Sequence, residues 1–320
     1  MKIKYIIGAV ALLATGFFAP QESTAQSRPV QLLETHVDAR SAAMGGFTLA
    51  NTDRNYLYVN PASIFQTDKA LTISAGGMMF PKMEMVKGQL MNATATAGWK
   101  FLDRHVAYAG FRYQGGLSIP SVNDQFGTPG KDLSPFDWSV DLGYAFKFNN
   151  QLSAFASGSF VQSFTGRTAY AAAFNLGANY LLDLSNNGSA SLLNIAARVA
   201  DLGAPVAFSA KESFALPSRV EVTGDYSREF SKNRRLAAVL GGRYYFLADK
   251  VAYSANVGAE YTLYNMVSLR AGYQYGSNSS SFLSTGVGVN LYNVKLDLAL
   301  LSGMGEFKSN RMMLSLSFDY

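Results

Sequence analysis

Few residues of this chain have the types and spacing that catalysis requires. The chain has no cysteine and only two histidines, His36 and His105, which lie far apart in the sequence. An acyl-hydrolase site needs a serine beside a histidine and a carboxylate, and no Gly-x-Ser-x-Gly segment presents such a serine. Gly45-Gly46 is not followed by the Lys-Ser/Thr pair of a phosphate-binding loop. We therefore predict a protein that is not an enzyme and that holds no metal and no cofactor.

Several charged residues lie on the polar face of segments whose other face is apolar. They are Arg219, Glu221, Asp225, Glu260, Lys295 and Asp297. Two interpretations are open: these charges line a channel and select its solutes, or they pair with one another inside a plugged lumen. We favour pairing, because buried charges are tolerated only when they are paired or hydrated.

The segments that carry these charges alternate between apolar and polar residues. From position 251 to 263 the odd positions are Val, Tyr, Ala, Val, Ala, Tyr and Leu, whereas the even positions are mostly polar or small. Successive side chains of a strand point to opposite faces, so this pattern predicts a strand with one apolar face. Strands of ten or more residues are longer than those of soluble sandwiches and suit strands that cross an outer membrane.

Segments of this kind recur along the chain and predict an all-β fold, a transmembrane antiparallel β-barrel of about fourteen strands. We expect strands at 69–80, 90–103, 104–117, 136–149, 151–164, 170–184, 190–202, 217–230, 235–248, 251–264, 266–276, 281–292, 294–303 and 310–320. Short connections suit tight turns at one rim, whereas 116–135 and 203–216 suit longer loops at the other rim. These two loops are our candidates for contact with partners or cargo.

Tyrosines on the apolar faces predict an aromatic girdle at each membrane interface. Tyr253 and Tyr261 would lie roughly 20 Å apart along the axis of a tilted strand, which is close to the separation of two such girdles. Tyr170 and Tyr180 share an apolar face in the same way.

The last ten residues predict the strand that closes the barrel. Met312, Leu314, Leu316, Phe318 and Tyr320 would form its apolar face. A terminal strand that ends in an aromatic residue is typical of outer-membrane barrels. We expect Leu316, Phe318 and Tyr320 to be the insertion signal that the barrel-assembly machinery recognises.

The first 25 residues predict a cleaved secretory signal peptide. Met1-Lys2-Ile3-Lys4 is basic, an apolar run follows from 6 to 19, and Ser23-Thr24-Ala25 supplies small residues before a cleavage point. The alternative is a buried N-terminal helix. The formal net charge of +5 comes from scattered residues, so the composition does not favour a nucleic-acid partner.

Residues 26–68 do not alternate, and we expect them to form a plug inside a barrel that spans 69–320. The candidate plug residues are Ser41, Met44, Gly45, Gly46, Asn60, Pro61 and Ala62. Small residues permit close backbone packing, and a lumen of this size needs filling or gating. The alternative is a disordered periplasmic extension, against which the apolar content of the segment argues.

The order of several motifs resembles a known family. Segments 38–46 (DARSAAMGG) and 60–62 (NPA) resemble the N-terminal signature of the PorV/PorQ-like proteins of Bacteroidota, within the FadL-like barrel superfamily. Segment 194–203 (NIAARVADLG) resembles the middle of that family. Residues 258–261, 269–273, 286–288 and 295–297 resemble its C-terminal third. The resemblance implies a fourteen-stranded FadL-like outer-membrane barrel with an N-terminal plug.

The resemblance implies two functions. The first is a subunit of a protein secretion or surface-assembly complex: type IX secretion of the PorV/PorQ kind, or another outer-membrane assembly machine. Its partners would be outer-membrane or periplasmic subunits and secreted cargo proteins. The alternative is a FadL-like transporter that passes hydrophobic small molecules through a plugged lumen and a lateral opening. In either case the barrel would lie among outer-membrane lipid and lipopolysaccharide.

Overall fold

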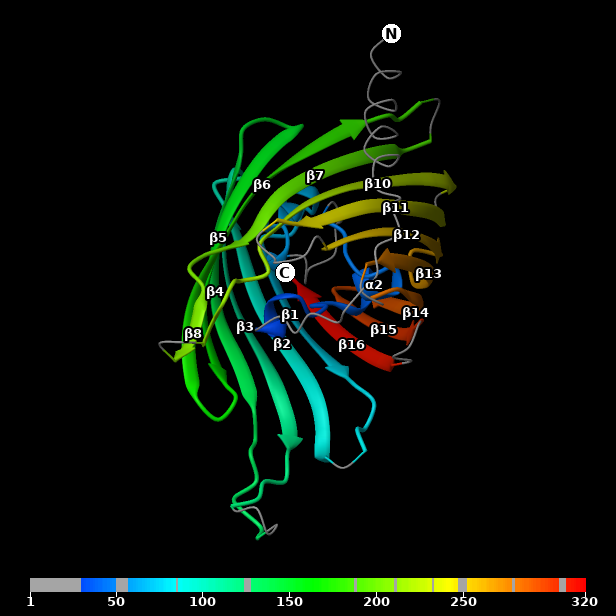
Figure 1. Cartoon of the computed structure of the whole chain (residues 1–320). Coiled ribbons are helices and arrows are strands. Elements are labelled where there is room, and N and C mark those ends of the chain that lie inside the picture. Colours follow the sequence, from blue (N-terminus) through cyan, green and yellow to red (C-terminus); the bar gives the residue numbers. More distant parts are fainter. Residues whose placement is uncertain are drawn as a thin grey trace.

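The chain forms a closed barrel of fourteen antiparallel strands, with a short hairpin outside the wall (Figure 1). The computed structural model describes residues 30–49, 57–84, 86–123, 128–186, 189–209, 212–231, 233–246, 252–277, 280–304 and 309–320. The predicted signal peptide lies outside these ranges, as does part of the predicted plug. Among the residues described, no helix is long and apolar enough to cross a membrane.

The barrel strands follow one another around the wall, except that β7 pairs directly with β10. They are β1 (Leu71–Met79), β2 (Lys87–Phe101), β3 (His105–Ser118), β4 (Phe136–Lys147), β5 (Leu152–Phe164), β6 (Thr168–Asp183), β7 (Ser191–Leu202), β10 (Arg219–Ser231), β11 (Arg234–Tyr245), β12 (Ala252–Leu263), β13 (Val267–Gly276), β14 (Phe282–Leu291), β15 (Val294–Gly303) and β16 (Asn310–Asp319). The fourteen predicted strands are confirmed, each boundary to within three residues. The sequence missed the hairpin β8 (Val206–Ser209) and β9 (Glu212–Phe214), which lies in the loop predicted at 203–216.

Alternation sorts the side chains of the wall into an outer apolar face and an inner polar face. On β16, Leu314, Leu316 and Phe318 are exposed on the outside, whereas Ser315 and Ser317 are buried on the inside. The outer residues can therefore contact lipid, and the inner residues must find polar partners within the lumen.

The first and last strands close the wall by antiparallel pairing, from Thr72 with Asp319 to Met79 with Met312. The pairing continues to the end of the chain: the Leu71 N–H donates to the Tyr320 carbonyl (2.9 Å), and the Tyr320 N–H donates to the Leu71 carbonyl (2.8 Å). The closing strand is therefore held by backbone bonds, while the Tyr320 side chain points outward and is 75% exposed.

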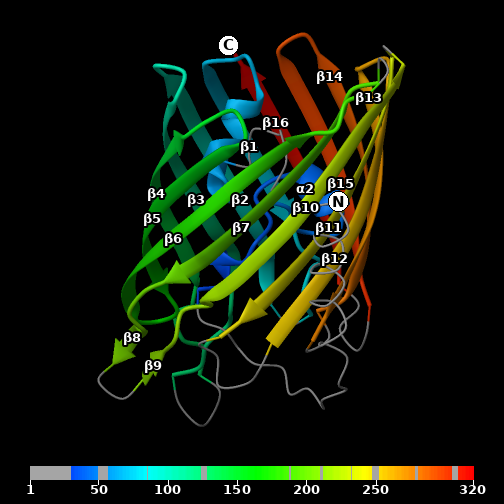
Figure 2. The same ribbon diagram turned by 90° about the horizontal axis from the view of Figure 1, so that it is seen from above.

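The two rims of the barrel differ. Turns such as Leu102–Arg104 and Tyr292-Asn293 join strands at the rim that holds the C-terminus, whereas β8 and β9 lie at the opposite rim (Figure 2). Bacterial barrels have short periplasmic turns and longer extracellular loops. By this rule we call the rim opposite the C-terminus the outer rim.

A bulge in the wall changes which residues of β7 face inward. The register between β6 and β7 shifts between Phe174 and Leu176, so that Ala200 and Asp201 are both buried. Asp201 has a positive φ of 55°, and its N–H donates to the Asn175 side chain at 3.0 Å. The bulge thus turns a carboxylate into the lumen near the outer end of β7.

The segment predicted as a plug lies inside the barrel wall (Figure 2). It contains the short helices η1 (Gln31–Leu33), α2 (Ala39–Ala43) and η3 (Pro61–Gln66). Its apolar side chains pack against inward-facing residues of the wall in several separate clusters. The plug and the wall therefore form the core of the molecule together.

We predict that Tyr320→Ala will lower the amount of barrel in the membrane severalfold without unfolding it. The substitution keeps both backbone hydrogen bonds to Leu71 and removes the exposed aromatic ring that we expect the assembly machinery to recognise. Quantitative blotting of outer-membrane fractions measures the effect. Tyr292→Ala, at a fully exposed turn tyrosine of the same rim, is the control. Normal membrane levels of the Tyr320 variant would contradict the prediction.

Candidate functional site

The glycines of the plug motif lie against the backbone of the wall. A side chain at Gly45 would come within 2.8 Å of the Val257 carbonyl and 2.9 Å of the Tyr273 carbonyl. Gly45 and Gly46 also have φ values of 89° and 105°, which favour glycine. On the wall, Gly258 and Gly272 face the Met44-Gly45 backbone in turn. Glycines on both sides thus form a slot that receives the plug backbone.

Polar side chains of the wall hydrogen-bond the plug backbone after α2. The Ser284 hydroxyl accepts from the Gly45 N–H (3.1 Å) and donates to the Ala43 carbonyl (2.9 Å). The Asn256 amide donates to the Phe47 carbonyl at 2.8 Å. A buried loop is tolerated only when its backbone polar groups find partners, and the wall supplies them here.

The start of α2 is capped within the plug motif. The Asp38 carboxylate accepts from the Ser41 N–H (2.8 Å) and from the Ser41 hydroxyl (2.5 Å). Such a cap satisfies a free N–H of the first turn and fixes where the helix begins. Ser41 therefore positions the helix that carries Arg40 toward the wall, and Met44, which follows it, is fully buried.

The Asn60-Pro61-Ala62 motif ties two parts of the plug together. The Asn60 side chain accepts from the Ala62 N–H (3.0 Å) and caps η3, which begins at Pro61. The same amide donates to the Leu49 carbonyl (2.5 Å) and to the Asn179 side chain of β6 (3.1 Å). Asn60 thus joins the plug ends on either side of residues 50–56 to the wall.

An ion-pair network, which we call the plug latch, joins the plug to the wall. The Glu260 carboxylate accepts from Arg40 Nε (2.7 Å) and Nη2 (2.8 Å) of the plug. It also accepts from Arg270 Nε of β13 at 2.7 Å, and Arg270 Nη1 donates to Asp297 at 2.6 Å. Two arginines and two carboxylates thus balance one another in a buried site.

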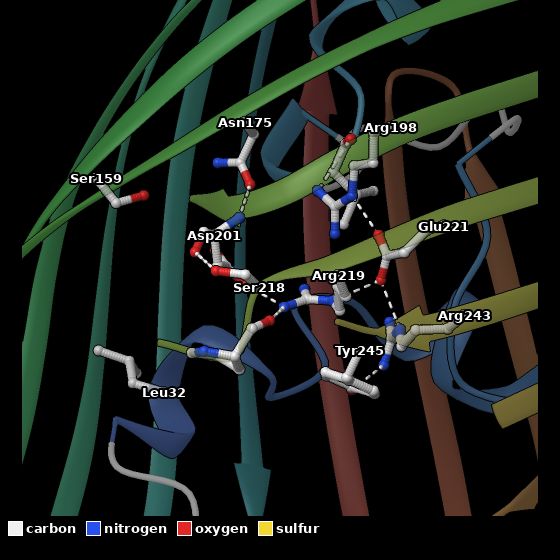
Figure 3. Close-up of polar contacts among 12 residues, drawn as sticks. Leu32, Ser159, Asn175, Arg198, Asp201, Ser218, Arg219, Glu221, Arg243 and Tyr245 are labelled. Carbon is white, nitrogen blue, oxygen red and sulfur yellow. Dashed lines mark hydrogen bonds and ion pairs between the residues drawn. The ribbon is translucent and has the colours of Figure 1, made fainter. Parts of the chain in front are cut away.

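A second network, the Glu221 network, joins side chains of the neighbouring strands β7, β10 and β11 (Figure 3). Arg219 Nε donates to Glu221 at 2.8 Å, Arg243 Nε lies 2.5 Å from the same carboxylate, and Arg198 also bonds it. Arg219 reaches the bulge residue Asp201 as well.

Two of the three arginines of this network also contact the plug. Arg198 Nη1 donates to the Val59 carbonyl at 3.1 Å. The Arg243 guanidinium lies 4.1 Å from the centre of the Phe47 ring. These contacts combine a charged donor with a buried carbonyl and a cation with an aromatic face.

The predicted pairing of lumen charges with one another is confirmed for Arg219 and Glu221, whereas Glu260 and Asp297 pair with arginines outside the predicted set. Asp225 is buried in the wall and Lys295 is partly buried. The sequence did not single out the partners Arg40, Arg198, Arg243 and Arg270. The register between strands would identify three of these partners, because Glu221 lies opposite both Arg198 and Arg243, and Glu260 lies opposite Arg270.

A third polar group narrows the middle of the lumen. Arg112 Nη2 pairs with Asp141 at 2.6 Å, and the Arg112 guanidinium lies 5.0 Å from the centre of the Tyr58 ring of the plug. A cavity between these side chains and Arg198 has a volume of about 20 Å³. This space suits about one water molecule and no organic ligand.

A larger cavity, which we call the vestibule, opens at the outer rim with a volume of about 740 Å³. It is lined by the plug residues Val30 and Gln31, the outer ends of β3 to β5, the β5–β6 turn and the β8–β9 hairpin. Phe208 and Phe214 of the hairpin meet edge to face with ring centres 6.2 Å apart. The salt bridge Arg167–Glu212 (3.3 Å) joins the turn to the hairpin.

The vestibule adjoins an apolar cluster inside the barrel. Val30 and Phe208 belong to both. The cluster contains Val30, Leu32 and Leu33 of the plug, Val161, Ala169, Ala171 and Ala173 of the wall, and Val206, Leu216 and Phe208 at the outer rim. The outer end of the lumen therefore offers an apolar surface, in contrast to the polar networks farther in.

The predicted girdle tyrosines lie on the outer face of the barrel. Tyr170 and Tyr180 are 58% and 40% exposed near opposite ends of β6. Tyr253 and Tyr261 are partly exposed near opposite ends of β12. These positions suit two interfacial bands, and the girdle and the insertion signal both stay predictions.

The fold has counterparts among solved structures. TodX of Pseudomonas putida, a toluene transporter, superimposes with a TM-score of 0.64 at 13% identity, covering 90% of this chain and 99% of that one. TbuX of Ralstonia pickettii, also a toluene transporter, gives a TM-score of 0.62 at 13% identity, covering 90% and 99%. The chain has a FadL-like barrel fold. At these identities the likeness establishes the fold alone.

Sequence comparisons do not assign the chain to a family. No protein-family model matches the chain, and no curated protein matches its sequence. The resemblance to the PorV/PorQ-like proteins therefore stays a prediction.

We predict that Glu260→Gln will release the plug without opening the barrel wall. The change leaves Arg40 and Arg270 buried beside a neutral amide, and breaking a buried pair costs about 3 to 5 kcal/mol. The expected result is larger and more frequent openings in planar-bilayer recordings. Glu229→Gln, at an exposed carboxylate of β10, is the matched control. Conductance equal to that of the wild type would contradict the prediction.

We predict that acid will weaken plug docking through His36. Its Nδ1–H donates to the Gly46 carbonyl at 2.8 Å, and its ring meets Phe282 edge to face. Burial, together with the charges of Arg311 and Arg243, lowers the pKa of His36 to about 3, although the hydrogen bond to the Gly46 carbonyl raises it.

Because the docked ring stays neutral, only the released plug takes up a proton as the pH falls below about 6.5. Docking should then weaken by about 1.4 kcal/mol per pH unit. Plug proteolysis between pH 7 and pH 4 measures this effect. His36→Gln can still donate to Gly46 but does not titrate, so an identical pH profile for the variant and the wild type would contradict the prediction.

Proposed function

We propose that this barrel carries small hydrophobic molecules across the outer membrane. The observation that carries the proposal is the vestibule, whose aromatic hairpin is continuous with an apolar cluster inside the lumen. A general diffusion porin has a polar, water-filled lumen. A concave site with an apolar wall and a few polar groups is instead typical of a binding site for organic molecules.

The vestibule has the dimensions of a ligand site. Its volume of about 740 Å³ lies within the range of pockets that bind drug-sized molecules. Val30 brings the plug into its lining, so a bound molecule would touch the element that closes the lumen. The vestibule is therefore placed to collect a molecule at the outer rim and to present it to the plug.

The polar networks set a condition for transport. The cavity beside Arg112, Asp141 and Arg198 holds about 20 Å³, so a molecule in the vestibule does not fit this space while the plug is docked. It must displace the plug or leave sideways through the wall, as the resemblance to the FadL-like superfamily implies. The plug latch and the Glu221 network would then control passage.

The known proteins of similar fold agree with this function. TodX and TbuX are both described as toluene transporters. Their similarity supports transport of hydrophobic molecules rather than the subunit role in a secretion or surface-assembly complex.

The subunit role stays a prediction with one feature in its favour. The loop between β3 and β4 projects beyond the barrel in Figure 1, and its arms pair at Ile119–Leu133 and Val122–Pro129. Such a projection is available to a partner. Pull-down from detergent extracts of native membranes tests this role: large partners that are lost on deletion of 119–133 would support it, and recovery of the barrel alone would count against it.

We predict that the barrel will raise uptake of a neutral hydrophobic solute such as naphthalene. The host is a bacterium that has an outer membrane and lacks its own importer of hydrophobic solutes. Phe208→Ser with Phe214→Ser removes the aromatic wall and should lower uptake severalfold, because apolar contact area is lost. Phe230→Ser, at an exposed phenylalanine of the opposite rim, is the matched control. Uptake that is the same with and without the barrel would refute the transport function.

A further inference from the structure

Three polar side chains form a row on the inner wall of the vestibule. Gln114 of β3 lies opposite Asp137 of β4, and Asp137 lies opposite Ser163 of β5. All three line the vestibule. Side chains at paired positions of neighbouring strands lie about 5 Å apart, so one ligand group can meet two of them at once.

The first member of the row has an unmet hydrogen-bonding atom. Gln114 is only 7% exposed, and its Oε1 has no hydrogen-bond partner in the part of the chain that the structure describes. Burying an acceptor without a donor costs free energy, and such groups are rare in native proteins. A ligand that donates a hydrogen bond at this point would remove the cost.

The second member is a carboxylate that forms no ion pair with the described residues. The Ser163 hydroxyl hydrogen-bonds Asp137, and no ion pair joins Asp137 to a lysine or arginine of the described ranges. Arg167, which also lines the vestibule, is paired with Glu212. Among the described lining residues the charges are therefore one arginine against two carboxylates, and the unbalanced charge is negative.

The other side of the vestibule is apolar. Phe208 and Phe214 belong to the hairpin, and Val30 begins the described part of the plug. A molecule that fits both sides has an apolar body against these residues and a donor group against the row. A carboxylate in the same place would meet the Asp137 charge and an amide oxygen without gaining a free cation.

We propose that the vestibule selects hydrophobic molecules that carry a hydrogen-bond donor, an ammonium or a hydroxyl group, over hydrophobic carboxylates. This inference rests on the proposed transport function and names its substrate class. The apolar body packs on Phe208 and Phe214, and the donor binds Gln114 Oε1 and the Asp137 carboxylate. A charge-assisted hydrogen bond is roughly twice as strong as a neutral one, so the order of affinity is ammonium, then alcohol, then carboxylate.

Four fluorescent probes of one ring system test the order: 1-naphthylmethylamine, 1-naphthalenemethanol, 1-methylnaphthalene and 1-naphthoate. Equilibrium dialysis against the purified full barrel in neutral detergent at pH 7 gives their affinities, with barrel-free detergent as the blank. The amine should bind roughly tenfold or more tightly than the carboxylate, with the alcohol between them. A carboxylate that binds as tightly as the amine overturns the inference.

Asp137→Asn keeps the shape of the side chain and removes its charge. It should abolish most of the preference for the amine over the carboxylate and leave the affinity for 1-methylnaphthalene unchanged. Asp132→Asn, at a loop carboxylate that pairs with Lys87 away from the vestibule lining, should leave the ratio as in the wild type. If Asp137→Asn does not change the ratio of amine affinity to carboxylate affinity, the role of Asp137 is overturned.

The probes also separate this inference from the transport function. Failure of all four to bind would count against both. Equal binding of all four would leave the hydrophobic site in place and refute only the selection by donor group. If a variant folds poorly, the order of probe affinities measured with the wild-type barrel still decides the inference. Heat-modifiable gel migration shows which variants are folded.

Discussion

The structure depends on the requirement that charges inside a barrel be paired. Glu260 meets this requirement by bonding Arg40 of the plug and Arg270 of the wall at once. Without Glu260, Arg40 would lose this carboxylate and Arg270 would retain only Asp297, and removing one partner of a buried ion pair costs several kcal/mol. The plug is therefore part of the electrostatic balance of the wall, and its position follows from that balance.

The same requirement explains the division of the lumen into two zones. The middle is polar, because Glu221 pairs with three arginines, two of which, Arg198 and Arg243, also contact the plug. The outer end is apolar around Val30 and Phe208, which pack with small wall residues such as Ala171. A hydrophobic molecule thus finds a favourable surface only until it reaches the charged networks. If the proposed transport function is right, passage is controlled at the boundary between these zones.

The wall was predictable from the sequence to a large extent, and the site was not. Alternation is a local property, so segments such as 310–320 and 251–264 revealed their strands without knowledge of their neighbours. Pairing of Glu221 with Arg198 and Arg243 depends on register between strands, and the position of Asp201 depends on a bulge that alternation does not encode. The hairpin that brings Phe208 and Phe214 together has strands of four and three residues, too short to show a period. The candidate site therefore depends on contacts that only the folded chain defines.

The short connection between η3 and β1 keeps the plug at a high local concentration beside the barrel wall that binds it. The plug ends at Gln66 and the wall begins at Leu71, so a released plug stays tethered beside its slot. A short tether gives a local concentration in the millimolar range. The docked state can therefore predominate even if the intrinsic affinity of the plug for the wall is modest. Such a plug can leave and return many times without being lost, which a separate subunit of equal affinity could not do.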